Sequence, residues 1–318
     1  MRDIVGALFK LGATSYGGPA IMGIMQAELQ RKRAWVSKER FLEGLAVANM
    51  VPGATATQLG IFLAYARGGW WAGLVGGFCF VLPAFVIMLA LTLAYAGLGL
   101  TPLVRGALSG LGPVVVGLFG VALYRLGRSA ASTVPEAGIG VLAALAAAVT
   151  PLGIVAILLL AGAAGLVLFQ PRRPLTVAVS LAVFVPVVSV SWWAAAVTPI
   201  SGAGRIPDPH NLVELAAYFS AVGAFTIGSG LTMIAFIQDQ VVGQFGWLTP
   251  REFIDGLALG QLTPGPVLMI AAYVGYKLAG VAGATVAATA AFLPSFVIML
   301  TLLPVLDRVR KLAWVRAS

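Results

Sequence analysis

Residues 41–53 read FLEGLAVANMVPG, and residues 253–265 read FIDGLALGQLTPG. The two stretches share a Phe, a Gly-Leu-Ala run and a closing Pro-Gly pair at the same spacing. Glu43 lies over Asp255, so an acidic residue occurs at the same place in both. Because apolar composition does not align acids and Pro-Gly pairs by chance, these stretches indicate an internal repeat.

The repeat extends well beyond these two stretches. Residues 14–53 align with residues 226–265 without a gap, with ten identical positions that include Trp35 over Trp247. After a slip of a single position the match resumes further along the chain. It places Leu82-Pro83-Ala84-Phe85-Val86-Ile87-Met88-Leu89 over Leu293-Pro294-Ser295-Phe296-Val297-Ile298-Met299-Leu300.

Each repeat opens with two apolar segments that helix breakers interrupt at their centres. In the first repeat the segments cover about residues 4–30 and 37–66. The breaks are Gly17-Gly18-Pro19 and Pro52-Gly53 in the first repeat, and Gly228-Ser229-Gly230 and Pro264-Gly265-Pro266 in the second. Proline lacks the amide donor and glycine leaves helical geometry easily. Freed backbone groups survive in a bilayer only when buried in protein or facing a wet cavity. One break would be a tolerated kink, whereas four at matching positions favour discontinuous helices around a site.

The composition around the repeat is that of a membrane protein. The chain has 318 residues, of which 60% are hydrophobic and only 10% charged, and its mean hydropathy is +0.98. A soluble domain carries about 25% charged residues. We therefore exclude a soluble enzyme, a nucleic-acid binder and a disordered chain, and predict an all-α polytopic membrane protein. The expected full spans cover about residues 70–97, 104–124, 135–149, 152–169, 175–196 and 281–303.

The basic residues discriminate between two topologies. If each broken segment is a hairpin that returns to its own side and the N-terminus is cytoplasmic, sixteen of the twenty Lys and Arg residues face the cytoplasm. The four that then face outward are Arg105, Arg205, Arg251 and Lys277. If the broken segments instead crossed the membrane fully, eleven of these basic residues would face the cytoplasm and nine would face outward. Because basic residues concentrate in cytoplasmic loops, the bias favours hairpins, and the net charge of +9 reports topology rather than a nucleic-acid partner.

The loops also predict the domain organisation. The loop at residues 31–40 is strongly basic, whereas its repeat partner at 243–252 carries only Arg251 against Glu252. We therefore expect inverted repeats: residues 1–170 form the first, residues 171–211 a linker span and outer loop, and residues 212–318 the second. The alignment of the repeats ends at Val315-Arg316, so the second repeat is expected to lack its last spans. We expect the N-terminal segment to be retained, because Lys10 interrupts its apolar run.

The breaks suit an anionic substrate. A helix that restarts after a break presents unpaired amide groups and the positive end of its dipole. The small residues Gly17, Gly18, Gly228 and Gly230 would let an oxyanion approach the backbone. Neutral polar side chains accompany the breaks, namely Asn49, Thr55, Thr57, Gln58, Ser229, Gln261 and Thr263. Such residues also join transmembrane helices to one another, which is an equally good explanation for any single one of them.

The ionisable candidates are few. Lys10 and Arg40 could pair with an anion, although snorkelling and topology are commoner roles for such residues. Glu43 and Asp255, at one repeat position, are candidates for proton coupling, because intramembrane carboxylates often relay protons. The alternative is that they cap or neutralise helix ends near the interface. Ser37 and Thr249 are predicted N-caps of the helices that carry them.

The sequence offers no catalytic chemistry. Cys79 is the single cysteine and His210 the single histidine, so neither has a partner for nucleophilic or zinc chemistry. We therefore expect no enzyme activity, no metal and no cofactor.

The motifs resemble those of the chromate ion transporter (CHR) family. The resemblance rests on Leu11-Gly12-Ala13-Thr14-Ser15-Tyr16-Gly17-Gly18-Pro19, on Gly246-Trp247-Leu248-Thr249, on residues 253–266, and on Phe292-Leu293-Pro294-Ser295. It covers nearly the whole chain apart from residues 130–215. Tyr16 stands where the family has Phe, and Ala54 where it usually has a second proline.

The resemblance implies a carrier of the inner membrane that exports chromate, a sulfate-like dianion. The residues alone reach only an oxyanion carrier. A carrier of sulfate or another oxyanion and a passive anion channel remain the alternatives. Two-domain members of the family typically continue further. A partner subunit, such as a second copy in a homodimer, would cover the flank that a short second repeat exposes.

Overall fold

The computed structural model describes residues 1–16, 18–97, 133–149, 208, 210–226 and 231–310, together with isolated positions between 110 and 168. Every regular element in these ranges is a helix, which confirms the predicted all-α class. The chain divides into two compact units. The first contains residues 1–115 and 207–318, and the second residues 116–206.

The first broken segment forms α1 (Arg2–Thr14) and α2 (Gly18–Met25), which continues in the wider π-helical turns of η1 (Gln26–Lys32). Helix α1 ends because Ser15 is extended, with φ −92° and ψ 121°. Gly17 lies outside the described residues. The predicted break is therefore observed between α1 and α2.

The second broken segment forms α3 (Lys38–Met50) and the start of α4 (Thr55–Gly97). Ser37 caps α3 by accepting a hydrogen bond from the Arg40 amide, as predicted. Helix α4 consists of two helical segments joined by a kink at Gly68 and Gly69, which leave helical geometry. Gly69 has φ 76°, a conformation that glycine adopts easily. The later part of α4 coincides with the predicted span at residues 70–97.

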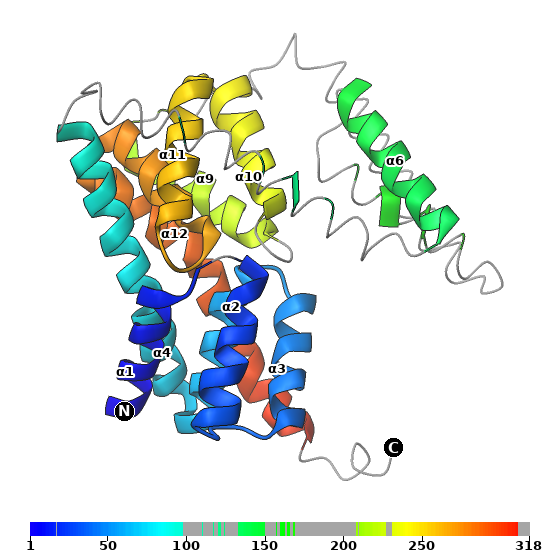
Figure 1. Cartoon of the computed structure of the whole chain (residues 1–318), viewed down its shortest axis with the longest axis vertical. Helices are drawn as coiled ribbons and strands as arrows, with labels where there is room; N and C mark the ends of the chain where they lie inside the picture. Colours follow the sequence, from blue (N-terminus) through cyan, green and yellow to red (C-terminus); the bar gives the residue numbers. More distant parts are fainter. Residues whose placement is uncertain are drawn as a thin grey trace. The chain divides into compact units, whose positions relative to one another are not determined.

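The second half of the chain repeats this order (Figure 1). It consists of α9 (Leu212–Phe225), α10 (Leu231–Gln238), η2 (Asp239–Gln244), α11 (Pro250–Leu262), η3 (Val267–Met269) and α12 (Ile270–Arg310). Thr249 and Glu252 form the capping box of α11. Helix α12 kinks at Ala279 and Gly280, which are the repeat counterparts of Gly68 and Gly69 in α4.

Two equivalent close contacts hold the broken segments against the long helices. A Cβ atom on Gly12 of α1 would lie 2.1 Å from the Phe80 carbonyl oxygen of α4, and one on Gly223 of α9 would lie 2.1 Å from that of Ala291 in α12. Each helix can approach the other's backbone only because glycine has no side chain. Gly12 and Gly223 each lie two residues before the end of the first helix of their repeat, and Phe80 and Ala291 are repeat counterparts. In Figure 1, α1, α2 and α3 gather toward one end of this unit and α9, α10 and α11 toward the other, while α4 and α12 extend along both.

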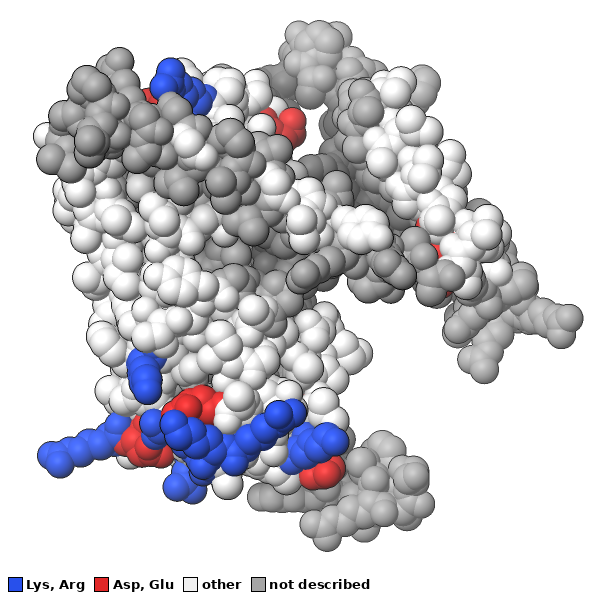
Figure 2. Space-filling view, viewed as in Figure 1, with Lys and Arg blue, Asp and Glu red and all other residues white. Residues whose placement is uncertain are grey.

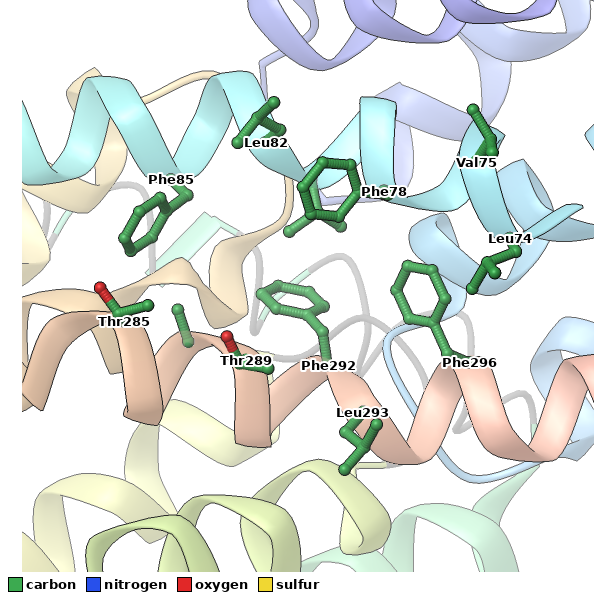
Figure 3. A pocket seen from close by; sticks show the side chains of 12 residues that line it. Leu74, Val75, Phe78, Leu82, Phe85, Thr285, Thr289, Phe292, Leu293 and Phe296 are labelled. Atoms are coloured by element: carbon green, nitrogen blue, oxygen red, sulfur yellow. The ribbon is translucent and has the colours of Figure 1, made fainter. Parts of the chain in front are cut away.

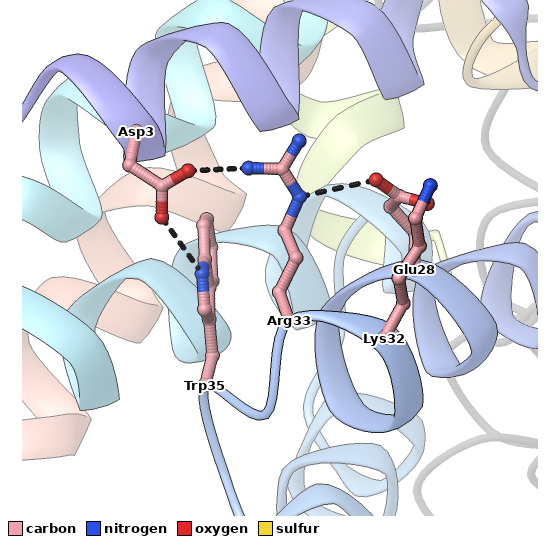
Figure 4. Close-up of polar contacts among 5 residues, drawn as sticks. All are labelled: Asp3, Glu28, Lys32, Arg33 and Trp35. Carbon is pink, nitrogen blue, oxygen red and sulfur yellow. Dashed lines mark hydrogen bonds and ion pairs between the residues drawn. The ribbon is translucent and has the colours of Figure 1, made fainter.

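A polar network joins the two ends of the first broken segment (Figure 4). Asp3, at the start of α1, pairs with Arg33 and accepts a hydrogen bond of 3.0 Å from the Trp35 indole nitrogen. Arg33 also pairs with Glu28 at 3.0 Å. Because Asp3 lies near one end of the segment and Arg33 follows its other end, the chain returns to the end where it started.

The second unit contains α6 (Val134–Val149), which coincides with the predicted span at residues 135–149. Glu136 caps this helix by accepting a hydrogen bond from the Thr133 amide at 2.8 Å. The spans predicted at residues 104–124, 152–169 and 175–196 fall mostly outside the described residues.

Two helical stretches in the described ranges are long and apolar enough to cross a membrane, Thr55–Gly97 and Val267–Arg308. Within them lie the predicted spans at residues 70–97 and 281–303. Figure 2 shows that Lys and Arg side chains gather on this face at the end where α1, α2 and α3 lie. The basic loop at residues 31–40 belongs to this end.

Candidate functional site

The four helices that precede the breaks end in the same way. The residue after each helix is extended: Ser15 after α1, Val51 after α3, Thr226 after α9 and Thr263 after α11. Helix continuation is impossible at the two Pro-Gly pairs, where Gly53 has φ 137° and Gly265 φ 102°. The backbone is thus freed from helical hydrogen bonding at all four points.

The freed backbone groups of one repeat bond those of the other. The Gly53 amide donates to the Thr226 carbonyl at 2.6 Å, and the Gly265 amide donates to the Ser15 carbonyl at 2.7 Å. Gly53 and Gly265 occupy one repeat position, and Ser15 and Thr226 are each the residue that directly follows the first helix of their repeat. The four breaks therefore meet in two equivalent pairs, which we call the Gly53 crossing and the Gly265 crossing.

Buried polar side chains surround the Gly53 crossing. The Ser295 hydroxyl accepts a hydrogen bond of 2.8 Å from the Ala54 amide, and Gln58 Nε2 donates to the Pro52 carbonyl at 2.8 Å. A Cβ atom on Gly53 would lie 2.3 Å from Gln58 Nε2 and 2.7 Å from Ser295 Oγ. Glycine is therefore required at residue 53 both for its φ and for space.

Apolar side chains surround the Gly265 crossing. A Cβ atom on Gly265 would lie 2.6 Å from the Ala84 methyl group. The hydroxyl of Thr263 donates to the Leu259 carbonyl at 2.9 Å and lies 3.3 Å from the Met88 sulfur. The hydroxyl of Ser15, whose carbonyl accepts the hydrogen bond from the Gly265 amide, is a further buried polar group at this crossing.

Three buried polar atoms near the breaks have no hydrogen-bond partner among the residues that the structure describes. They are Ser15 Oγ, Thr57 Oγ1 and Gln58 Oε1, on side chains that are fully buried. An unpaired buried polar group costs about 1–3 kcal/mol, so native proteins keep few of them without a functional reason. These atoms make the region of the crossings the candidate binding site.

The remaining predicted site residues lie at varying depth. Asn49, Pro52 and Lys10 are exposed, Gln261 is half-buried, and Thr55, Pro264 and Pro266 are buried. Gly18 and Pro19 begin α2, whereas Gly17, Gly228, Ser229 and Gly230 lie outside the described residues. The structure thus brings the two Pro-Gly breaks and Gln58 together with Ser15 and Thr226.

Arg40 lies in an ion-pair cluster rather than at the crossings. Its guanidinium pairs with Glu43 at 2.8 Å and with Asp307 of α12 at 2.9 Å, and it stacks 4.7 Å from the ring centre of Phe62. Two carboxylates thus pair with one guanidinium, so the positive charge of Arg40 is already balanced by Glu43 and Asp307.

The equivalent position in the second repeat shows different chemistry. Asp255 accepts a hydrogen bond of 2.8 Å from the hydroxyl of Tyr95, which belongs to α4. The neighbouring Glu252 pairs with Lys277 at 2.7 Å. Glu43 and Asp255 therefore each belong to a polar cluster that connects one repeat's short helix to the other repeat's long helix.

Sequence reasoning missed four of these residues: Ser15, Tyr95, Ser295 and Asp307. Ser295 had a weak signal, since it replaces Ala84 in an otherwise matching stretch of the repeat. Ser15 lies within a motif that carries the family resemblance, but nothing in that motif singles it out. Tyr95 and Asp307 had no signal, because their roles depend on contacts with residues far away in the sequence.

An apolar groove of about 660 Å³ lies between α4 and α12. Figure 3 shows Phe78, Leu82 and Phe85 of α4 facing Phe292 and Phe296 of α12 across it. Because its lining is almost entirely apolar, the groove offers no set of donors for an anion. It is therefore separate in chemistry from the crossings.

His, Cys, Asp and Glu side chains form no group of three that could hold a metal ion in the part of the chain that the structure describes.

Comparison with known proteins identifies the family. The family model for chromate transporters matches residues 2–166 and 213–318. The probable chromate transport protein of Synechococcus elongatus is 33% identical over 306 residues, which cover 96% of this chain and 75% of that protein. The chromate transport protein of Cupriavidus metallidurans is 32% identical over 314 residues, which cover 96% of this chain and 74% of that protein. An uncharacterized transporter of Methanocaldococcus jannaschii is 25% identical over 319 residues, which cover 97% of this chain and 77% of that protein.

No solved structure matches the chain. The long apolar helices and these relatives define a membrane transporter rather than an enzyme. The chain belongs to the chromate transporter family, as its motifs indicated.

Proposed function

We propose that this protein is a secondary transporter that exports chromate, a sulfate-like oxyanion, across the cytoplasmic membrane. The observation that carries the proposal is the meeting of the four breaks at two buried crossings, with amide-to-carbonyl distances of 2.6 and 2.7 Å. Secondary transporters bind their substrates where broken helices from two repeats meet. The substrate is taken from the names of two relatives, one a chromate transport protein and the other a probable chromate transport protein.

The proposed architecture is a pair of inverted repeats. The ends of the first broken segment are joined by Asp3 and Arg33, and those of the fourth by Glu252 and Lys277, as expected for segments that return to their own side. The gathering of α1 to α3 at one end and α9 to α11 at the other supports opposite orientations (Figure 1). The basic end then faces the cytoplasm, together with the N-terminus.

Substrate binding is assigned to the crossings and their flanking residues, and proton coupling to Glu43 and Asp255. The neutral site at Gly53 and Gln58 recognises the anion through dipoles, while the carboxylates lie in clusters that join the two repeats. Such clusters can form and break as one repeat moves against the other, which is the motion of alternating access.

Uptake into inside-out membrane vesicles tests this function. Radiolabelled chromate should enter vesicles that contain the protein, the rate should saturate with concentration, and a protonophore should reduce it. Vesicles without the protein provide the control, and unlabelled sulfate in excess measures competition.

Three results would contradict the proposal. Correctly inserted protein that takes up no chromate would exclude the transport function. Flux that neither saturates nor responds to the proton gradient would indicate a passive channel. Uptake of sulfate in strong preference to chromate would make the protein a sulfate carrier.

A further inference from the structure

The two crossings share a backbone geometry but differ in their side chains. Gln58 and Ser295 lie against Gly53. The repeat counterpart of Ser295 is Ala84, and at the place of Gln58 the second repeat has the apolar pair Met269-Ile270. None of these side chains carries a nitrogen or an oxygen. At the Gly265 crossing the buried hydroxyl of Ser15 is available, but Ala84 rather than a polar side chain lies against the glycine. Because a polar ligand needs polar partners when it leaves water, the Gly53 crossing, with an amide and a hydroxyl against its glycine, is better equipped to hold one.

The orientation of the Gln58 amide is fixed by its own hydrogen bond. Nε2 donates to the Pro52 carbonyl at 2.8 Å, and the opposite orientation would place two oxygens against each other. Oε1 is therefore an acceptor, and it has no partner among the described residues although its side chain is fully buried. An unpaired buried acceptor calls for a ligand that carries a hydrogen-bond donor.

The neighbouring N-terminal end of α4 favours an anion. Helix α4 begins at Thr55, just after Gly53 and Ala54, so the positive end of its dipole lies at the Gly53 crossing. This helix end favours negative charge and disfavours a cation. The hydroxyl of Thr57, also buried and unpaired in the described part of the chain, can donate or accept.

A protonated oxyanion satisfies both requirements, because it carries a negative charge and an O–H donor. We propose that the Gly53 crossing is the single substrate site and that it binds a tetrahedral oxyanion in its monoprotonated form, with the anion's O–H donating to Gln58 Oε1. The inference rests on the proposed transport function. It adds the protonation state of the substrate and identifies Gln58 as the residue that recognises it.

This site would distinguish chromate from sulfate. Chromate gains its first proton close to neutral pH, whereas sulfate remains unprotonated except in strong acid. A buried acceptor left unpaired by an analogue that lacks the donor discriminates strongly against that analogue. Gln58 thus provides a physical basis for selecting hydrogen chromate over sulfate.

Calorimetric titration of the purified protein with chromate tests the inference. The apparent affinity should fall about tenfold for each pH unit above the pH at which hydrogen chromate loses its proton, because only the protonated fraction binds. Sulfate should compete poorly throughout this range. Gln58→Leu should weaken binding about tenfold or more at the acidic end and should abolish the pH dependence.

Two further variants serve as comparisons. Thr57→Val keeps the acceptor of Gln58, so its binding should be weaker but equally dependent on pH. Ala84→Ser adds a hydroxyl at the Gly265 crossing and should change neither affinity nor pH dependence, because that crossing holds no substrate. Size-exclusion chromatography checks that each variant is folded.

The inference is overturned if the native protein binds chromate with an affinity that does not depend on pH, or if sulfate competes equally well. It is also overturned if folded Gln58→Leu keeps the native pH dependence. Each of these results leaves the transport function standing with the dianion as substrate. An absence of any chromate binding by the folded protein would instead contradict the proposed function itself.

Discussion

Charged residues in the described core are engaged with one another, whereas the crossings are lined by neutral groups. Arg40 pairs with two carboxylates, Asp255 is bonded to Tyr95, and Gln58 and Ser295 surround Gly53. A neutral site holds an anion through oriented dipoles. At the scale of single residues, the site is therefore most sensitive to space and to hydrogen-bond geometry.

Gly53→Ala should destabilise the protein. The new methyl group would lie 2.3 Å from Gln58 Nε2, and alanine is strained at φ 137°. We expect a loss of about 1–3 kcal/mol, measured as a lower thermal unfolding midpoint in detergent. Gly6→Ala is the matched control, because a methyl group there meets nothing within 4 Å and lies on the helical surface of α1. Equal midpoints for the two variants would contradict the tight packing of the Gly53 crossing.

Asp255→Asn should reduce the response of chromate uptake to a proton gradient, because an amide cannot carry the proton of a carboxylate. Tyr95→Phe is the control, since it removes the hydrogen bond of 2.8 Å but keeps the carboxylate. Uptake into vesicles is compared with and without a protonophore. If Asp255→Asn responds to the gradient like the native protein, Asp255 does not couple protons.

At the scale of elements, the first and the fourth broken segments fold back so that their two ends lie together. Thr249 caps α11 through Glu252, and the same Glu252 pairs with Lys277 near the kink of α12. In the first repeat, the guanidinium of Arg40, in the first turn of α3, stacks on Phe62 of the returning helix. Short helices that return in this way place their breaks deep in the structure and their polar ends at its surface.

Labelling from either side of the membrane tests the orientation of these elements. Lys32→Cys and Gln244→Cys occupy one repeat position, and both native side chains are exposed. In a Cys79→Ser background, an impermeant thiol reagent should label residue 32 only from the cytoplasmic side and residue 244 only from outside. Labelling of both from one side would exclude inverted repeats.

At the scale of the whole molecule, the described parts of the two repeats are interlocked. The amides of Gly53 and Gly265 each bond the other repeat, and Arg40 reaches Asp307 at the far end of the chain. The long helices α4 and α12 also pack against each other. Neither repeat could keep its breaks satisfied alone, because the hydrogen-bond partners are on the other one.

A double-mutant cycle measures this connection. Arg40→Ala and Asp307→Ala should each lower the thermal unfolding midpoint, and together they should lower it by less than the sum of the single effects. The side chains are 15% and 35% exposed, so we expect a coupling energy of about 1 kcal/mol. Glu43→Ala in the Asp307→Ala background provides a comparison, because Arg40 then loses both of its carboxylates. Strictly additive effects of Arg40 and Asp307 would contradict the ion pair.

Much of the local structure could be predicted from residue types. Ser37 and Thr249 cap their helices as expected, and the Pro52-Gly53 and Pro264-Gly265 pairs break them. The kink at Gly69 was expected only as a boundary between a hairpin and a span. These features are local, since a proline without an amide or a hydroxyl at an N-cap acts within one helical turn.

The helical class, the membrane environment, the repeat and the positions of the breaks follow from the amino-acid sequence, because each depends on composition or on neighbouring residues. The folded arrangement was needed to learn which breaks meet, that Gln58 and Ser295 lie against Gly53, and that Tyr95 and Asp307 engage the other repeat. These contacts join residues up to 267 positions apart. Their existence depends on how the long helices pack, and no local pattern in the sequence encodes that packing.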